Sequence, residues 1–126
     1  MVKSVFISST KNDLLEYRAA VDTAIRNLDM LPINMDYFGS QPGGALSVSL
    51  REVGQANVFV GIIARRYGHV PEGMEKSITE QEYDEAERLT LPRLMYLLDP
   101  SYDWPEDKVE QSEVAQAKLK AFRAQI

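Results

Sequence analysis

The sequence has no cysteine and only one histidine among its 126 residues. Without cysteine the chain has no disulfide, no thiolate nucleophile and no cysteine-based metal site. Zinc sites are built mainly from cysteine and histidine, so a single histidine, His69, argues against one. We therefore expect no metal and no bound cofactor, and we expect His69 to be exposed to solvent.

Long apolar runs and an excess of positive charge are also missing. The longest apolar run, Val58 to Ala64, is far shorter than the roughly 20 residues that span a bilayer. The residues after Lys3 turn polar too soon for the hydrophobic segment of a signal peptide. The net charge of −5 argues against a nucleic-acid or anionic membrane partner. These features predict a cytoplasmic protein with neither kind of partner.

Four short segments have the composition of β-strands. Three of them, residues 5–7, 58–63 and 94–98, are apolar almost without interruption. Continuous apolar runs are typical of parallel strands that are covered on both faces. The fourth, residues 32–38, mixes polar and apolar residues and predicts an edge strand with Pro32 at its start.

Helical patterns separate these strands. Apolar residues recur at helical spacing from Leu14 to Leu28, and Thr10 is the expected N-cap of that helix. The same spacing recurs over residues 46–53, from Thr79 onward, and from about 110 to 122. Alternating strands and helices predict a parallel sheet with helices on both faces. The expected fold is a flavodoxin-like three-layer α/β sandwich with four strands in the order 2-1-3-4.

The chain is predicted to form one domain over residues 1–126. Residues 1–99 are expected to form its core, and residues 100–126 a proline-rich turn and a C-terminal helix. A doubly wound domain usually returns to one more strand, and none follows that helix. We therefore expect the chain to be the N-terminal part of a longer protein, with an edge that can pair with another copy.

Three polar loops follow the predicted strands. They are Ser8 to Thr10, the glycine-rich residues 39–45, and residues 65–77. Each loop alone is explained by ordinary turn chemistry. Open α/β sheets bind ligands at the carboxyl ends of their strands, and three polar loops at that edge predict a cleft.

Several segments together resemble a known family. They are "VFISSTKNDLLEYRAAVDTAI", "MDYFG", "ARRYG" and "SITEQEYDEA" followed by "LPRLMYLLD". In this order they are similar to the bacterial domain-of-unknown-function 4062 family, over about the first hundred residues. That family is regarded as TIR-like and often stands at the N-terminus of larger NTPase or repeat-containing proteins of signalling or defence type. The resemblance implies a TIR-like signalling module with a nucleotide-type cleft, which self-associates or docks within a larger multidomain protein.

The same resemblance implies a role for Glu82. In TIR domains that cleave NAD, the catalytic glutamate lies near the start of the helix after the third strand, which matches Glu82. Nucleoside deoxyribosyltransferases carry a nucleophilic glutamate in a Thr-x-x-Glu context, which Thr79 and Glu82 reproduce, but Asp84 stands where a glycine usually follows. The implied activity is cleavage of the N-glycosidic bond of NAD or a related nucleotide.

The residues themselves leave two interpretations of Glu82 open. Thr79 and Glu82 have the spacing of a capping box, which needs no catalytic role. However, Ala86 and Leu89 follow Glu82 by four and seven residues, so Glu82 shares the apolar stripe of its helix. On that geometry Glu82 faces the cleft and acts on a ribose as the bond breaks.

The neighbours of Glu82 have different expected positions. Glu80, Asp84 and Glu87 are expected to point toward solvent, away from the apolar stripe. Glycosidic chemistry usually employs a second acid or base. Asp13 and Asp36 are the candidates for that group, by position alone.

The remaining candidate ligand-binding residues each have a structural alternative. Arg18 lies on the inner helical face, where it would hold a phosphate or a cleft carboxylate, or pack its stem with its head in water. Arg66 would neutralise a phosphate. Tyr67 and Gly68 belong to the segment "RYG" that resembles the family, and the tyrosine would stack on a base or pack in the core. The remaining candidates, Ser8, Ser9 and Thr10, would offer hydroxyls and amides to a phosphate.

Two functions therefore remain open from the sequence. One is an effector enzyme with Glu82 at its centre, and the other is a non-enzymatic interaction or self-association module. A buried Glu82 facing a pocket favours the enzyme. A surface Glu82 bonded to Thr79 favours the interaction module.

Overall fold

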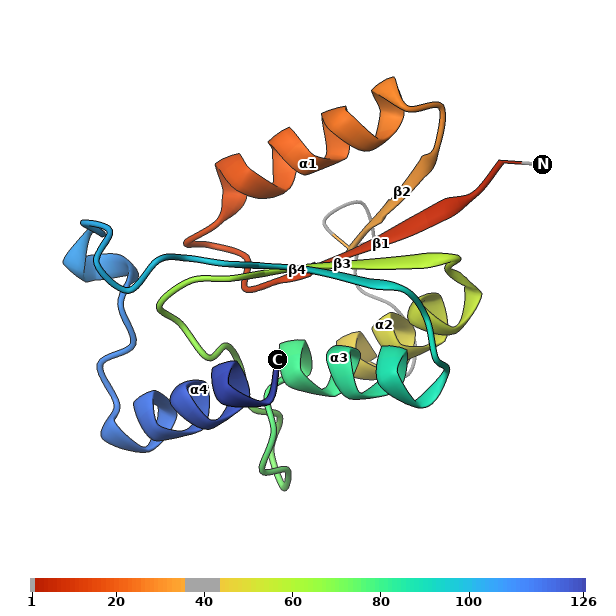
Figure 1. Cartoon of the computed structure of the whole chain (residues 1–126). Helices are drawn as coiled ribbons and strands as arrows, with labels where there is room; N and C mark the ends of the chain where they lie inside the picture. The colour runs from red at the N-terminus through yellow and green to blue at the C-terminus, as the bar shows by residue number, and fades with distance from the viewer. Residues whose placement is uncertain (1, 36–43) are drawn as a thin grey trace.

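The computed structural model describes residues 2–35 and 44–126. These residues form a four-stranded parallel sheet in the order β2-β1-β3-β4, with helices on both faces (Figure 1). The predicted flavodoxin-like α/β fold and its strand order are confirmed. The elements are β1 (Ser4–Ser9), α1 (Leu15–Asn27), β2 (Leu31–Asn34), α2 (Gly44–Gln55), β3 (Val58–Ile63), α3 (Ile78–Arg88), β4 (Arg93–Leu97), the short 3-10 helix η2 (Glu106–Lys108) and α4 (Glu113–Gln125).

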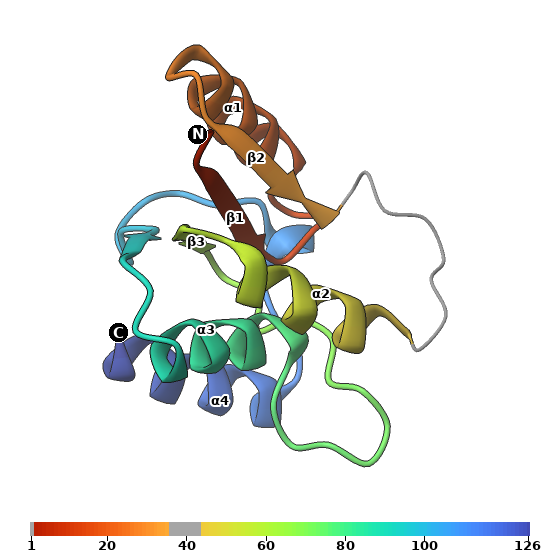
Figure 2. The ribbon, with the colours of Figure 1, turned by 90° about the vertical axis from the view of Figure 1, so that its right-hand side faces the viewer.

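The helices are divided unequally between the two faces of the sheet. Helix α1 covers one face, while α2, α3 and α4 lie together on the other (Figures 1 and 2). None of the described helices is long and apolar enough to cross a membrane. The crowded face holds the larger part of the core, and α2 and α3 on that face carry residues of the site described below.

A chain of aromatic rings joins the sheet to α3 and α4. The rings of Phe6 and Phe59, on neighbouring central strands, stack with centroids 5.9 Å apart. Tyr83 of α3 meets Phe59 edge-on at 6.4 Å and Phe122 of α4 at 5.5 Å. All four side chains are buried, so the middle of α3 is fixed against the sheet by well-packed contacts on its inner face.

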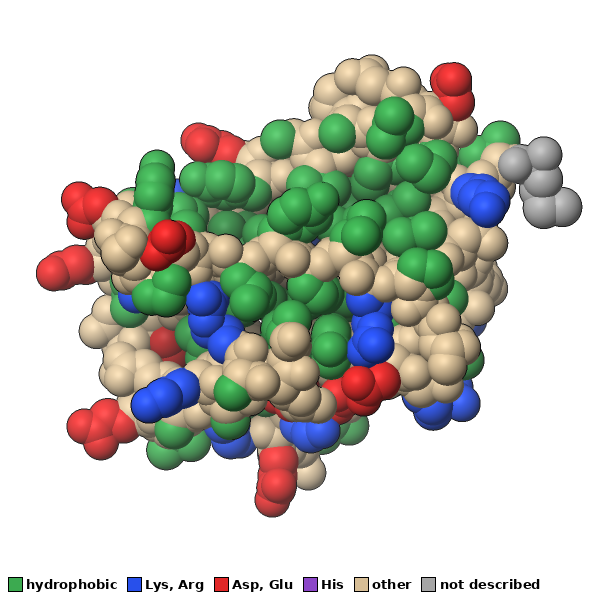
Figure 3. All heavy atoms as spheres, viewed as in Figure 1, with side chains coloured by type: hydrophobic (Ala, Val, Ile, Leu, Met, Phe, Trp, Pro, Cys, Tyr) green, Lys and Arg blue, Asp and Glu red, His purple; other side chains and the backbone are tan. Residues whose placement is uncertain are grey.

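Strand β4 differs from its predicted environment. Leu94 and Tyr96 are 53% and 59% exposed, so the expectation that this run is covered on both faces is wrong. Helix α1 packs on β1 and β2 and leaves this part of the sheet open. Figure 3 shows apolar side chains gathered on the side of the molecule where β4 forms the sheet edge.

The edge strand β2 is confirmed, and it runs over Leu31–Asn34. Its predicted continuation to residue 38 falls largely outside the described residues, as do Asp36 and most of the loop 39–45.

The expected N-cap of the first helix is wrong. Thr10 does not cap α1, which begins at Leu15 with Leu14 at its N-cap position and no side-chain cap. The Leu14 amide donates to the Lys11 carbonyl at 3.2 Å, so the chain makes a separate turn after Thr10 before the helix starts. That turn places the loop after β1 beside the site.

Candidate functional site

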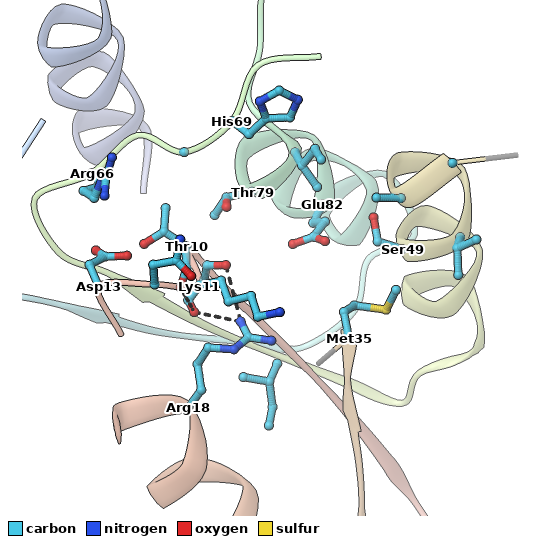
Figure 4. Close-up of a pocket in the computed structure, with 18 of the residues that line it drawn as sticks. Thr10, Lys11, Asp13, Arg18, Met35, Ser49, Arg66, His69, Thr79 and Glu82 are labelled. Atoms are coloured by element: carbon cyan, nitrogen blue, oxygen red, sulfur yellow. Dashed lines mark hydrogen bonds between the residues drawn. The ribbon is translucent and has the colours of Figure 1, made fainter. Parts of the chain in front are cut away.

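The carboxyl ends of the strands border a cavity of about 730 Å³. Its walls come from the loop after β1, the first turns of α1, α2 and α3, and the loop after β3 (Figure 4). Ligands of open parallel sheets bind at this edge, and the volume lies within the range of small-molecule sites. The predicted cleft is present at the predicted edge.

Glu82 is buried at the wall of this cavity. Glu82 is only 5% exposed to solvent. The Ser8 hydroxyl, at the end of β1, donates a hydrogen bond to Glu82 Oε1 at 2.7 Å. The Ser49 hydroxyl of α2 lies beside it (Figure 4). The carboxyl group therefore sits where β1, α2 and α3 converge.

Burial shifts the protonation of Glu82. Removal of the carboxyl group from water raises its pKa from 4.5 to about 7. Hydrogen bonds with Ser8 and Ser49 and the positive charge of Arg18 act in the opposite direction, but burial outweighs them. Near neutral pH, Glu82 therefore exists in both protonation states, which is suited to chemistry at that pH.

The cap of α3 is Ser77, and the predicted capping box of Thr79 with Glu82 is wrong. The Ser77 side chain accepts a hydrogen bond from the Glu80 amide at 3.1 Å. The sequence Ser77-Ile78-Thr79-Glu80 has the capping-box spacing as well, and the helix uses this register. Because the helix starts two residues earlier than predicted, Glu82 takes no part in capping.

Glu80 is buried, so the expectation that it points to solvent is also wrong. The Tyr67 hydroxyl donates to Glu80 Oε1 at 2.5 Å and accepts from the Ser77 amide at 3.1 Å. Tyr67 thus stands between the two halves of the capping box and links the loop after β3 to the start of α3. Burial and the Glu80 carboxylate raise the pKa of Tyr67, so its hydroxyl keeps its proton.

Arg18 is 4% exposed, so the alternative that placed its head in water does not hold. Its guanidinium donates to Ser9 Oγ at 2.8 Å and to Asn34 Oδ1 at 2.7 Å. These bonds tie α1 to the carboxyl ends of β1 and β2, and Arg18 also faces the cavity (Figure 4). A buried positive charge beside Glu82 favours anionic ligands.

Most of the predicted site residues lie at the cavity, and two do not form its wall. Gly68 lines it with φ near +100°, and a Cβ there would lie 3.1 Å from Thr10 Cγ2, so a side chain would crowd the wall. Tyr67 is part of the core, and Ser8 reaches the site through its bond to Glu82. His69 is exposed, as expected, and it also lines the cavity. The predicted residues that line it are Ser9, Thr10, Arg18, Arg66, Gly68 and Glu82.

Ser49 is a site residue that the sequence interpretation missed. It lies three residues after Leu46 and four before Val53, so it shares the apolar stripe of α2. This spacing predicts that Ser49 faces the cleft, just as the spacing of Glu82 to Ala86 does for Glu82. In the described part of the chain, no cluster of three or more histidine, cysteine or acidic side chains is placed to hold a metal ion.

Comparison with known proteins gives a family for this fold and cavity. The sequence model of one protein family, described as domain of unknown function (DUF4062), matches residues 4–126. The chain belongs to this family. No curated protein matches the chain. The match extends the resemblance seen in the first hundred residues through α4, and it carries no assigned activity.

The raised pKa of Glu82 predicts a specific pH dependence of stability. Between pH 4.5 and about 7 the folded state keeps a proton that the unfolded state loses, so the free energy of unfolding falls as pH rises. The full loss is up to about 3 kcal/mol. In Glu82→Gln this loss should be absent, as measured by urea unfolding at pH 4 to 8.

The exposed glutamate Glu87, on the same helix, provides the control. Glu87→Gln should keep the wild-type pH dependence and change stability only slightly, since its contact with Arg93 is at the surface. A Glu82→Gln protein that loses stability over this pH range as wild type does would show that Glu82 is not the titrating group.

Proposed function

We propose that this domain is a TIR-like effector enzyme that cleaves the N-glycosidic bond of NAD or a related nucleotide. One observation carries the proposal: the buried carboxyl of Glu82 lines a cavity at the carboxyl edge of the sheet and is not used for capping. Of the two interpretations left open by the sequence, a buried Glu82 facing a pocket is the one that favours an enzyme.

The reaction needs an ionised Glu82. As the bond between C1′ and the ring nitrogen breaks, its electron pair leaves with the nicotinamide, and positive charge develops on the ribose. The Glu82 carboxylate stabilises that charge, and water then adds to C1′ and releases a proton. The products are nicotinamide and ADP-ribose.

A pyridinium leaving group fits a site with one central carboxyl. The nicotinamide ring is positively charged in NAD and becomes neutral when it departs, so it needs no proton from a general acid. Neutral nucleosides leave poorly unless an acid protonates the base. This difference favours NAD over an ordinary nucleoside as the substrate.

The other residues at the cavity have supporting roles in this proposal. Ser8 orients the Glu82 carboxyl, and the positive charges of Arg18 and Arg66 favour the diphosphate. Gly68 lets the chain pass close to Thr10 without a side chain that would fill the cavity. We expect the domain to act in the cytoplasm, as the sequence features predict, and as a module of a larger signalling or defence protein, as the family resemblance implies.

The proposal is tested by NAD consumption at high protein concentration and on a clustering scaffold. Wild type should release nicotinamide, at a rate that rises with pH through about 7 as Glu82 ionises. Glu82→Gln should lower the rate by roughly 10²- to 10³-fold, as expected for loss of a group that stabilises the transition state.

The control is again Glu87→Gln, which keeps helix α3 and leaves the cavity untouched. It should consume NAD at the wild-type rate. No turnover by clustered wild type, or equal turnover by a folded Glu82→Gln protein, contradicts the proposed activity.

A second candidate function is self-association through the edge strand β4. Strand β4 pairs only with β3 among the described strands, and Leu94 and Tyr96 on it are exposed. An unpaired strand edge with apolar side chains can pair antiparallel with the same strand of a second copy. Such a dimer would join two four-stranded sheets into one.

This dimer is tested by sedimentation velocity over a range of concentrations. Wild type should form dimers at high micromolar concentration, and Leu94→Lys should remain monomeric because it places a charge in the interface. Val114→Lys, at an exposed position on α4, should dimerise as wild type does. Monomeric wild type, or an unchanged Leu94→Lys protein, excludes β4 as the interface.

A further inference from the structure

Asp13 is a buried carboxylate for which the described part of the chain provides no hydrogen-bond donor. It lies in the turn before α1, is 3% exposed and lines the cavity. Neither of its carboxylate oxygens, nor the hydroxyl of the neighbouring Thr10, has a partner among the described residues. Within the described structure, three buried oxygen atoms of residues that line the cavity are therefore unsatisfied.

Such groups are costly in a folded protein. A buried polar atom without a partner costs roughly 1–3 kcal/mol, and more for a charged one. Native structures keep few of them, and those they keep often serve function. Arg66 lies on the same side of the cavity (Figure 4), but it forms no ion pair with Asp13 in the described structure.

The chemistry of these atoms limits the ligand that would satisfy them. Carboxylate oxygens accept hydrogen bonds, so the ligand group must donate, and a phosphate is repelled. The vicinal hydroxyls of a ribose present two donors side by side to two carboxylate oxygens. In dinucleotide-binding sites of other α/β proteins an acidic residue binds ribose hydroxyls in this way.

The position of Asp13 favours the ribose that is remote from the reacting bond. Figure 4 shows Asp13 and Arg66 on one side of the cavity, Glu82 and Ser49 on the other, and Thr10 between them. A ligand whose reacting ribose meets Glu82 therefore has to pass Thr10 to reach Asp13. In a dinucleotide, the diphosphate would pass Thr10 and the second ribose would lie on the side of Asp13.

We propose that Asp13, with Thr10, forms a subsite for the hydroxyls of the second ribose, so that the cavity selects dinucleotides over mononucleotides. The proposal rests on the proposed function for the placement of the reacting ribose at Glu82. It assigns Asp13 to binding, whereas the sequence offered it only as a second acid or base.

The test is equilibrium binding of ADP-ribose, measured by calorimetry. ADP-ribose has no bond to nicotinamide, so binding is measured without turnover. Wild type should bind ADP-ribose about 10-fold or more tightly than the analogue that lacks the 2′-hydroxyl on its adenosine ribose, as expected for a hydrogen bond to a charged group. Asp13→Asn should bind the two ligands with nearly equal affinity. Asp84→Asn, on the outer side of α3, should discriminate as wild type does.

Equal binding of the two ligands by wild type overturns the proposal, as does full discrimination by a folded Asp13→Asn protein or no binding of ADP-ribose. If Asp13→Asn does not fold, the comparison of the two ligands on wild type decides alone. Discrimination without NAD turnover would keep the subsite and reject the proposed activity. Turnover of NAD without discrimination between the two ligands would keep the proposed activity and reject the subsite.

Discussion

The carboxyl group of Glu82 is buried at the end of a parallel sheet, and the Ser8 hydroxyl that donates to it joins α3 to β1. Burial of this ionisable group costs stability as the pH rises from 4.5 to about 7, so the surrounding structure must hold it there. The aromatic contacts from Phe59 through Tyr83 to Phe122 provide that support, because they fix the helix that carries Glu82. The packing of the core therefore also positions the site.

A helix start normally engages its acidic residues in capping. In this chain the capping register uses Ser77 and Glu80, with the Tyr67 hydroxyl placed between them. This arrangement keeps the α3 N-terminus satisfied and leaves Glu82 to face the cavity. Arg18 performs a similar task from the opposite face of the sheet, since its bonds to Ser9 and Asn34 hold two strand ends together.

The fold follows directly from the sequence, because apolar runs and helical spacing alternate clearly and the strand order is a common one. The position of Glu82 also followed from its spacing to Ala86. The predicted N-cap of α3 was wrong for a local reason. Two overlapping capping boxes occur in "SITEQE", and the tertiary contact with Tyr67 selects between them. That Asp13 has no donor among residues 2–35 and 44–126 could not be recognised from the sequence, since it depends on how the chain packs.

The most direct measurement of the central claim is a carbon-13 NMR titration of the glutamate side-chain carboxyls, with Glu82→Gln used to assign Glu82. One glutamate is expected to titrate near pH 7, and its resonance should be missing from the variant. A protein in which no glutamate titrates well above the ordinary value of 4.5 would contradict the burial of Glu82, and with it the proposed chemistry.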